Sequence, residues 1–136
     1  MDTRQLMVAD VMTIDPVVVG SDDSLEEAAR LLRAYSISGL PVVNQDGQLV
    51  GVISQTDLIA IEKAPIGRLI RSEASGLRVA EVMSSPAITV QMTGTLIEAA
   101  RLMRDRRVHR VVALNDAGRP VGVLSASVFV ALYADG

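Results

Sequence analysis

The chain repeats itself at a constant offset of 71 residues, and this repeat limits its possible folds more than any other feature. Three stretches of the first half return in the second half: 8–12 returns as 79–83, 25–33 as 96–104, and 50–54 as 121–125. A repeat of this length predicts two copies of one supersecondary unit, related by pseudo-two-fold symmetry. Differences between the copies then indicate which of two related clefts is equipped for function.

Each copy predicts the element order β-α-β-β-α. Short β-branched runs that follow a proline predict a first strand, and two further apolar runs around a turn predict a hairpin. An apolar stripe at helical spacing predicts the first helix, and a second helix follows the hairpin. In the first copy these elements are 16–19, a helix from Leu25, 40–43, 49–53 and 55–63; in the second they are 86–90, a helix from Leu96, 111–114, 121–124 and 126–133.

The starts of the first helices carry a specific signal. Ser24 is followed three residues later by Glu27, and Thr95 by Glu98 in the same way. In such a capping box, the hydroxyl and the carboxylate accept hydrogen bonds from N–H groups that the helix leaves unpaired. The pattern therefore predicts helices that begin at Leu25 and at Leu96.

Composition limits the function classes. With 136 residues, of which 49% are hydrophobic, we expect one compact module in which residues 64–78 connect a first copy (1–63) to a second (79–136). A net charge of −3 argues against nucleic acid as a partner, and no apolar run approaches the ~18 residues of a membrane helix. The absence of cysteine excludes disulfides and is compatible with a cytoplasmic protein.

The order and spacing of several motifs resemble a CBS domain, the module named after cystathionine β-synthase. Those motifs are a leading Val-x-x-Val-Met at 8–12, Ile-Ser-Gly-Leu-Pro-Val-Val at 37–43 and Gly-Val-Ile-Ser-Gln-Thr-Asp at 51–57. Two such domains in tandem resemble a Bateman module. The resemblance implies an α/β (α+β) fold of two βαββα units whose sheets pack against each other. It also implies clefts that bind adenine nucleotides such as AMP, ADP or ATP as regulatory signals.

The first candidate site is the strand end at Ser54, Thr56 and Asp57. Hydroxyl groups and free N–H groups at a helix start suit phosphate oxygens, and a carboxylate can accept both hydroxyls of a ribose diol. The same Ser-x-x-Asp spacing is also that of a plain helix cap. The family resemblance favours the ribose role for Asp57. In the second copy the aligned residue is Val128, which lacks an acceptor.

The second candidate is the pair His109 and Arg110, which stands where the first copy has the uncharged Ser38 and Gly39. The pair resembles the His-Arg of CBS domains in the γ subunit of AMP-activated protein kinase, where such residues meet nucleotide phosphates. The resemblance implies one composite site, with the sister cleft weak or empty. Its expected members are Val52, Ile53, Ser54, Thr56, Asp57, Ala87, Ile88, His109 and Arg110.

Three classes of function remain open. The leading one is a stand-alone sensor of an adenine nucleotide, which forms a homodimer and regulates an unidentified effector protein. The alternative is a ligand-free module for dimerisation or protein interaction. An enzyme is the least favoured class, since no catalytic triad, carboxylate pair, metal cluster or phosphate loop with lysine is evident. His109 has no second His or Cys with which to hold a metal.

Overall fold

The computed structural model describes residues 6–63 and 76–130. The chain forms two compact units that do not coincide with the sequence copies. We call residues Val17–Ala87 the N-terminal unit, and Met1–Pro16 together with Ile88–Gly136 the C-terminal unit. Each unit therefore draws its elements from both copies of the repeat.

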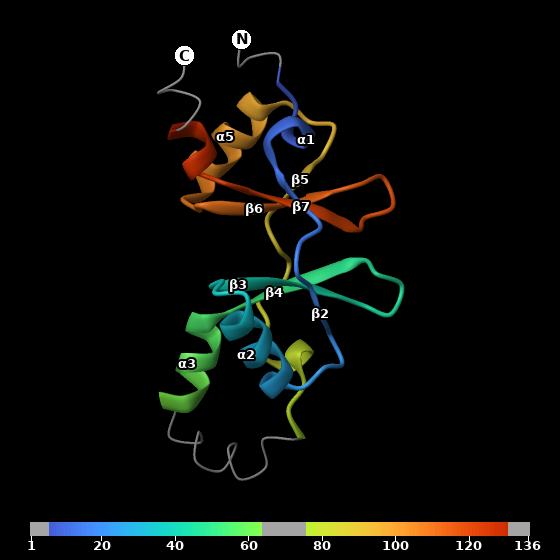
Figure 1. Cartoon of the computed structure of the whole chain (residues 1–136), viewed down its shortest axis with the longest axis vertical. Coiled ribbons are helices and arrows are strands. Elements are labelled where there is room, and N and C mark those ends of the chain that lie inside the picture. Colours follow the sequence, from blue (N-terminus) through green and yellow to red (C-terminus); the bar gives the residue numbers. More distant parts are fainter. Residues whose placement is uncertain (1–5, 64–75, 131–136) are drawn as a thin grey trace. The chain divides into compact units, whose positions relative to one another are not determined.

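The N-terminal unit is a three-stranded sheet with helices on one face (Figure 1). The strand order is β2-β3-β4, in which β2 is parallel to β3 and β3 forms an antiparallel hairpin with β4. The elements are β2 (Val19–Gly20), α2 (Leu25–Ala34), β3 (Gly39–Val43), β4 (Leu49–Ser54), α3 (Gln55–Lys63) and the short 3-10 helix η3 (Val79–Glu81).

The C-terminal unit is a four-stranded sheet of order β1-β7-β6-β5, with α1 and α5 on one face (Figure 1). Strands β6 and β7 form the hairpin, β5 is parallel to β6, and β1 is antiparallel to β7. The elements are α1 (Val8–Val11), β1 (Thr13–Ile14), β5 (Thr89–Gln91), α5 (Leu96–Arg106), β6 (Arg110–Leu114) and β7 (Pro120–Ser125).

Each unit has its own apolar core, built from equivalent positions of the two copies. Helix side chains three or four residues apart point toward this core, and so does every second side chain of the central hairpin strands. The N-terminal core comprises Val19, Ala28, Leu32, Leu40, Val42, Ile53 and Val79. The C-terminal core comprises Val8, Leu96, Ala99, Met103, Val111, Ala113 and Leu124.

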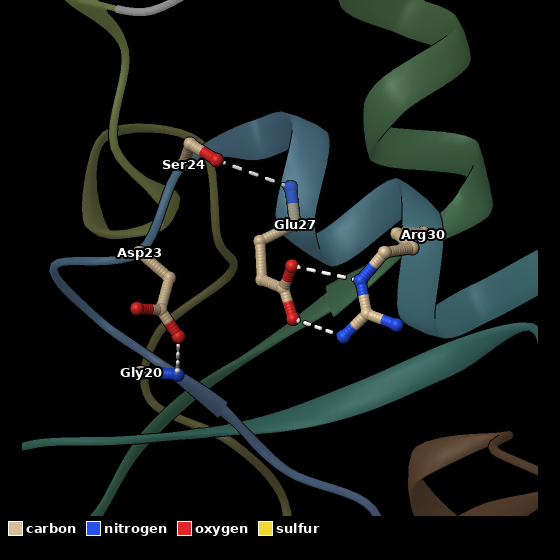
Figure 2. A network of polar contacts seen from close by, with 5 residues as sticks. All are labelled: Gly20, Asp23, Ser24, Glu27 and Arg30. Atoms are coloured by element: carbon tan, nitrogen blue, oxygen red, sulfur yellow. Dashed lines mark hydrogen bonds and ion pairs between the residues drawn. The ribbon is translucent and has the colours of Figure 1, made fainter. Parts of the chain in front are cut away.

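The predicted helix starts are confirmed, although only half of each capping box forms. The Ser24 hydroxyl accepts a hydrogen bond from the Glu27 N–H at 3.1 Å, and Thr95 accepts one from Glu98 at the same distance. The Glu27 carboxylate instead accepts two hydrogen bonds from Arg30, at 2.6 and 2.9 Å (Figure 2). This contact lowers the pKa of Glu27 and raises the pKa of Arg30.

The turn before α2 is held by a separate contact. The Asp23 carboxylate accepts a hydrogen bond from the Gly20 N–H at 2.8 Å, which closes the connection between β2 and α2 (Figure 2). The backbone carbonyls beside this turn also accept hydrogen bonds from residues of the second copy. Val79 donates its N–H to the Asp23 carbonyl, at 2.9 Å, and Ala80 donates to the Ser21 carbonyl, at 3.0 Å.

The exchange of short leading segments explains why units and copies differ. We call residues 6–14 the first leading segment and residues 77–85 the second. The first one adds α1 and β1 to the C-terminal unit, where Met12 and Thr13 cross β7 at Gly122. The second one adds η3 to the N-terminal unit, where Met83 and Ser84 cross β4 at Gly51.

Several expectations need adjustment. The strands expected at 16–19 and 86–90 are shorter and begin later, as β2 and β5, because pairing starts only where β3 and β6 lie alongside. The helix expected over 126–133 is seen at 127–130, and its end lies outside the described residues. Most of the connector 64–78 also lies outside them. The packing of the two sheets on each other stays a prediction.

No helix in residues 6–63 and 76–130 is long and apolar enough to cross a membrane.

Candidate functional site

The junction between β4 and α3 is fixed by a reciprocal pair of hydrogen bonds. The Ser54 N–H donates to Asp57 Oδ2 at 2.9 Å, and the Asp57 N–H donates to Ser54 Oγ at 3.1 Å. The helix cap that the sequence offered as one reading of Ser-x-x-Asp is therefore confirmed. Its carboxylate lies in the first turn, where the partial positive charge of the helix start favours it.

The same junction lies at one end of the sheet. Ser54 is the register partner of Gly39 at the start of β3, and the Gln55 N–H donates to the Ser38 carbonyl at 2.8 Å. Thr56 is exposed in the first turn of α3, and its hydroxyl takes no part in the cap. Ser54, Thr56 and Asp57 thus form one polar group at the sheet end, with Asp57 half-buried.

The other predicted residues of the N-terminal unit have different surroundings. Ile53 is fully buried and belongs to the core, so that only its backbone is available to a ligand. Val52 is half-buried, and its N–H and carbonyl both bond to Ser84, at 3.0 and 2.9 Å. Ala87, the last residue of the unit, is half-buried.

The basic pair lies at the corresponding end of the sheet in the C-terminal unit. Arg110 begins β6 opposite Ser125, and both His109 and Arg110 are exposed. The His109 carbonyl accepts a hydrogen bond from the Ala126 N–H at 2.8 Å, as Ser38 does from Gln55 in the other unit. Ile88 precedes the parallel neighbour β5, and its carbonyl accepts from the Val112 N–H at 3.4 Å.

The second copy replaces the carboxylate cap by a contact between two hydroxyls. Ser125 Oγ and Ser127 Oγ lie 2.7 Å apart. Val128, at the position equivalent to Asp57, is half-buried and packs against the core of its unit. Asp57 and the pair His109 and Arg110 therefore lie at equivalent ends of the two sheets, but in different units.

The sequence reasoning missed that carbonyls anchor both helix starts. Ser38 and His109 occupy equivalent positions, and each receives an N–H from the first residue after the last strand. The offset of 71 residues was the available signal. Residues 6–63 and 76–130 contain no group of three metal-ligating side chains.

Comparison with known proteins supports the fold and places the chain among its relatives. Residues 8–63 and 79–134 each match the model of the CBS domain. Inosine-5′-monophosphate dehydrogenase of Methanocaldococcus jannaschii is 31% identical over 121 residues, or 89% of this chain. This chain spans only about a fifth, 21%, of the length of that enzyme.

Two solved structures are similar over almost the whole chain. CBSX2, a CBS-pair protein of Arabidopsis thaliana, is 30% identical in its complex with AMP, with a TM-score of 0.80; the match covers 96% of this chain and 99% of CBSX2. The CBS domain pair of protein MJ0100, in complex with 5′-methylthioadenosine and S-adenosyl-L-methionine, is 25% identical with a TM-score of 0.73, over 95% and 96% of the two chains. The chain is a tandem pair of the CBS domain family.

Proposed function

We propose that this chain is a regulatory module that binds an adenine nucleotide of the AMP, ADP or ATP type, with Asp57 accepting the ribose hydroxyls. The observation that carries the proposal is the complex of CBSX2 with AMP, because that protein matches this chain over nearly its full length. MJ0100 adds two further ligands that contain adenosine. The group that these ligands share is the adenosine moiety.

The geometry of Asp57 allows a cap and a ligand contact at the same time. Its Oδ2 accepts one hydrogen bond from Ser54. An ionised carboxylate offers about four acceptor sites, so most of its capacity remains after the cap is made. Because the cap holds the side chain in place, a diol would meet an oriented carboxylate and lose less rotamer entropy on binding.

The phosphate end of the ligand requires donors and positive charge. On the Asp57 side, the Thr56 hydroxyl and the start of α3 provide them. His109 and Arg110 are the proposed further contacts, on the basis of the difference between the two copies. We expect about one ligand per chain, because the first copy alone carries the acid at this position and the second copy alone carries the basic pair.

Titration calorimetry with AMP, ADP and ATP tests the proposal. Asp57→Asn keeps an oxygen that can accept the Ser54 N–H but removes the charge, and hydrogen bonds to charged groups contribute about 1.5–3 kcal/mol. We expect nucleotide affinity to fall by at least about tenfold. The matched control is Asp10→Asn, because Asp10 Oδ2 also accepts an N–H three residues earlier, from Met7 at 2.8 Å.

Binding of none of the three nucleotides by the wild type would contradict the proposal. Equal affinities of Asp57→Asn, Asp10→Asn and wild type would leave Asp57 as a helix cap alone.

An interaction module is the second candidate, and exposed apolar side chains favour it. Tyr35 is 57% exposed after α2, and Ile59 is 41% exposed on α3. We propose that this side of the N-terminal unit contributes to a homodimer. Light scattering tests this: Ile59→Glu should lower the mass from that of two chains to one, whereas Glu26→Lys, a change on an exposed residue of α2, should not.

A further inference from the structure

Each leading segment packs on one unit as a short peptide packs on a binding site, and we call the surface that it packs on its receptor. Val8 and Val79 are fully buried in the cores that receive them, while Met12 and Met83 lie against a glycine of the last strand. For the first leading segment, Val8 donates an N–H to the Gly94 carbonyl at 2.9 Å. A receptor that is complete except for one short apolar segment is thus built into the C-terminal unit.

Each segment forms its own local structure. Asp10 Oδ2 accepts the Met7 N–H at 2.8 Å, and Glu81 Oε2 accepts the Arg78 N–H, also at 2.8 Å. Four of the five residues in 8–12 are identical to those in 79–83, and the fifth is Asp or Glu. The turn that docks is therefore shaped by contacts within the segment, which do not depend on which receptor it meets.

The link from the first segment to the rest of the chain has the features of a hinge. Asp15 has a φ of 53°, a left-handed conformation that costs a non-glycine residue free energy. On either side of it, Ile14 is 64% and Val18 is 36% exposed. A short hinge under strain favours domain swapping, because an open hinge relieves the strain while all docking contacts are kept.

We propose that the first leading segment also docks on the C-terminal unit of a second copy of this chain, so that two copies exchange residues 6–14 reciprocally. The contacts of Val8, Met12 and β1 are the same in the exchanged dimer, with the partner's unit as receptor. This exchanged dimer forms when chains refold together, and it depends neither on nucleotide binding nor on Ile59. The dimer that Ile59→Glu should dissociate is the one between closed chains that have not been refolded.

Cysteine cross-linking provides the first test, because the natural chain contains no cysteine. Thr13 and Val123 are register partners in β1 and β7, a separation that suits a disulfide. Chains carrying Thr13→Cys are mixed with chains carrying Val123→Cys, unfolded, refolded together and oxidised. We expect a linked species of twice 14.5 kDa.

Two controls make the cross-linking decisive. In the first control, chains carrying Gln91→Cys take the place of those carrying Val123→Cys. Gln91 is exposed on β5, at the opposite edge of the same sheet from β1, so this mixture should give at least tenfold less linked dimer. The double variant Thr13→Cys/Val123→Cys reports the closed chain. A link within that double variant, with none in the mixture, would overturn the proposal.

Complementation provides a readout that does not depend on disulfide geometry. Val8→Asp damages the segment and leaves the receptor intact, whereas Gly122→Ala damages the receptor and leaves the segment intact. After co-refolding, exchange restores one complete C-terminal unit per pair, so the mixture should show a melting transition above those of both variants. A melting curve equal to the sum of the separate curves would refute the exchange.

Discussion

A methyl group added at Gly51 should loosen the second leading segment from the N-terminal unit. A Cβ at this position would lie 2.6 Å from Met83 Sδ, 3.1 Å from Met83 Cγ and 2.8 Å from the Ser84 carbonyl oxygen. Gly51 is the point where the segment crosses β4, and the absence of a side chain permits that approach. We therefore expect Gly51→Ala to lower the free energy of unfolding.

The size of the expected loss in unfolding free energy depends on which atoms near the new Cβ can move away from it. The Met83 thioether is flexible and can turn away. The Ser84 carbonyl cannot, because it accepts the Val52 N–H at 3.0 Å while the Ser84 N–H donates to the Val52 carbonyl at 2.9 Å. Overpacking costs about 1–3 kcal/mol, and each hydrogen bond that is lost adds about 0.5–1.5 kcal/mol. We expect a loss of about 2–4 kcal/mol.

Urea unfolding followed by circular dichroism measures this loss as a lower midpoint at constant slope. Gly39→Ala is the matched control in the same hairpin: its Cβ would lie 3.7 Å from the Ile53 carbonyl oxygen, an ordinary contact. Gly122→Ala should destabilise in the same way, because its Cβ would lie 2.8 Å from the Thr13 carbonyl oxygen. Equal stabilities of Gly51→Ala and Gly39→Ala would refute the reasoning.

Three further predictions concern α2 and α5. Ser24→Ala should lower the free energy of unfolding by about 0.5–2 kcal/mol through loss of the cap, as thermal melting would show. Arg107→Gly should raise it by up to about 1 kcal/mol, because Arg107 ends α5 with a φ of 54°, whereas Arg101→Gly within the helix should lower it. Since Arg30 lowers the pKa of Glu27, the stability that this pair contributes is present above the unfolded value of 4.5 and is lost as pH falls through the folded pKa. The urea midpoints of wild type and Arg30→Gln should accordingly converge at low pH.

The local elements were predictable because their signals are short-range. Ser24 and Thr95 mark the helix starts, and α3 has the predicted bounds Gln55–Lys63. The first strands were misplaced because β2 and β5 exist only where a parallel neighbour lies beside them. Val19 pairs with Val42 and Thr89 with Val112, and these contacts are far apart in sequence.

The destination of the leading segments could not be predicted from the sequence. Residues 8–12 and 79–83 are nearly identical, and so are the two strands that they cross. Local preferences cannot distinguish docking on the same copy from docking on the other one, because both give the same contacts. The covalent connection of a segment to the rest of the chain, and the strain in that connection, decide which copy it docks on. Neither can be read from a sequence motif.

For the candidate site, sequence reasoning identified the cap at Ser54 and Asp57 but not the burial of its neighbours. Ile53 matches the family motif, yet the structure places its side chain in the core. A motif records which residues recur, whereas the direction of each side chain follows from strand alternation and packing. The role of Asp57 as a ribose contact, and those of His109 and Arg110, remain predictions.

A comparison of the two helix starts shows what the fold itself requires. In both units an N–H after the last strand donates to an equivalent carbonyl, of Ser38 or His109, at 2.8 Å. The C-terminal unit keeps this anchor although Val128 replaces the carboxylate and packs on the core. The junction therefore forms without an acid. Asp57 adds a cap of modest free energy and has acceptor capacity that the cap does not use. That remaining capacity is the physical ground for proposing Asp57 as a ligand contact.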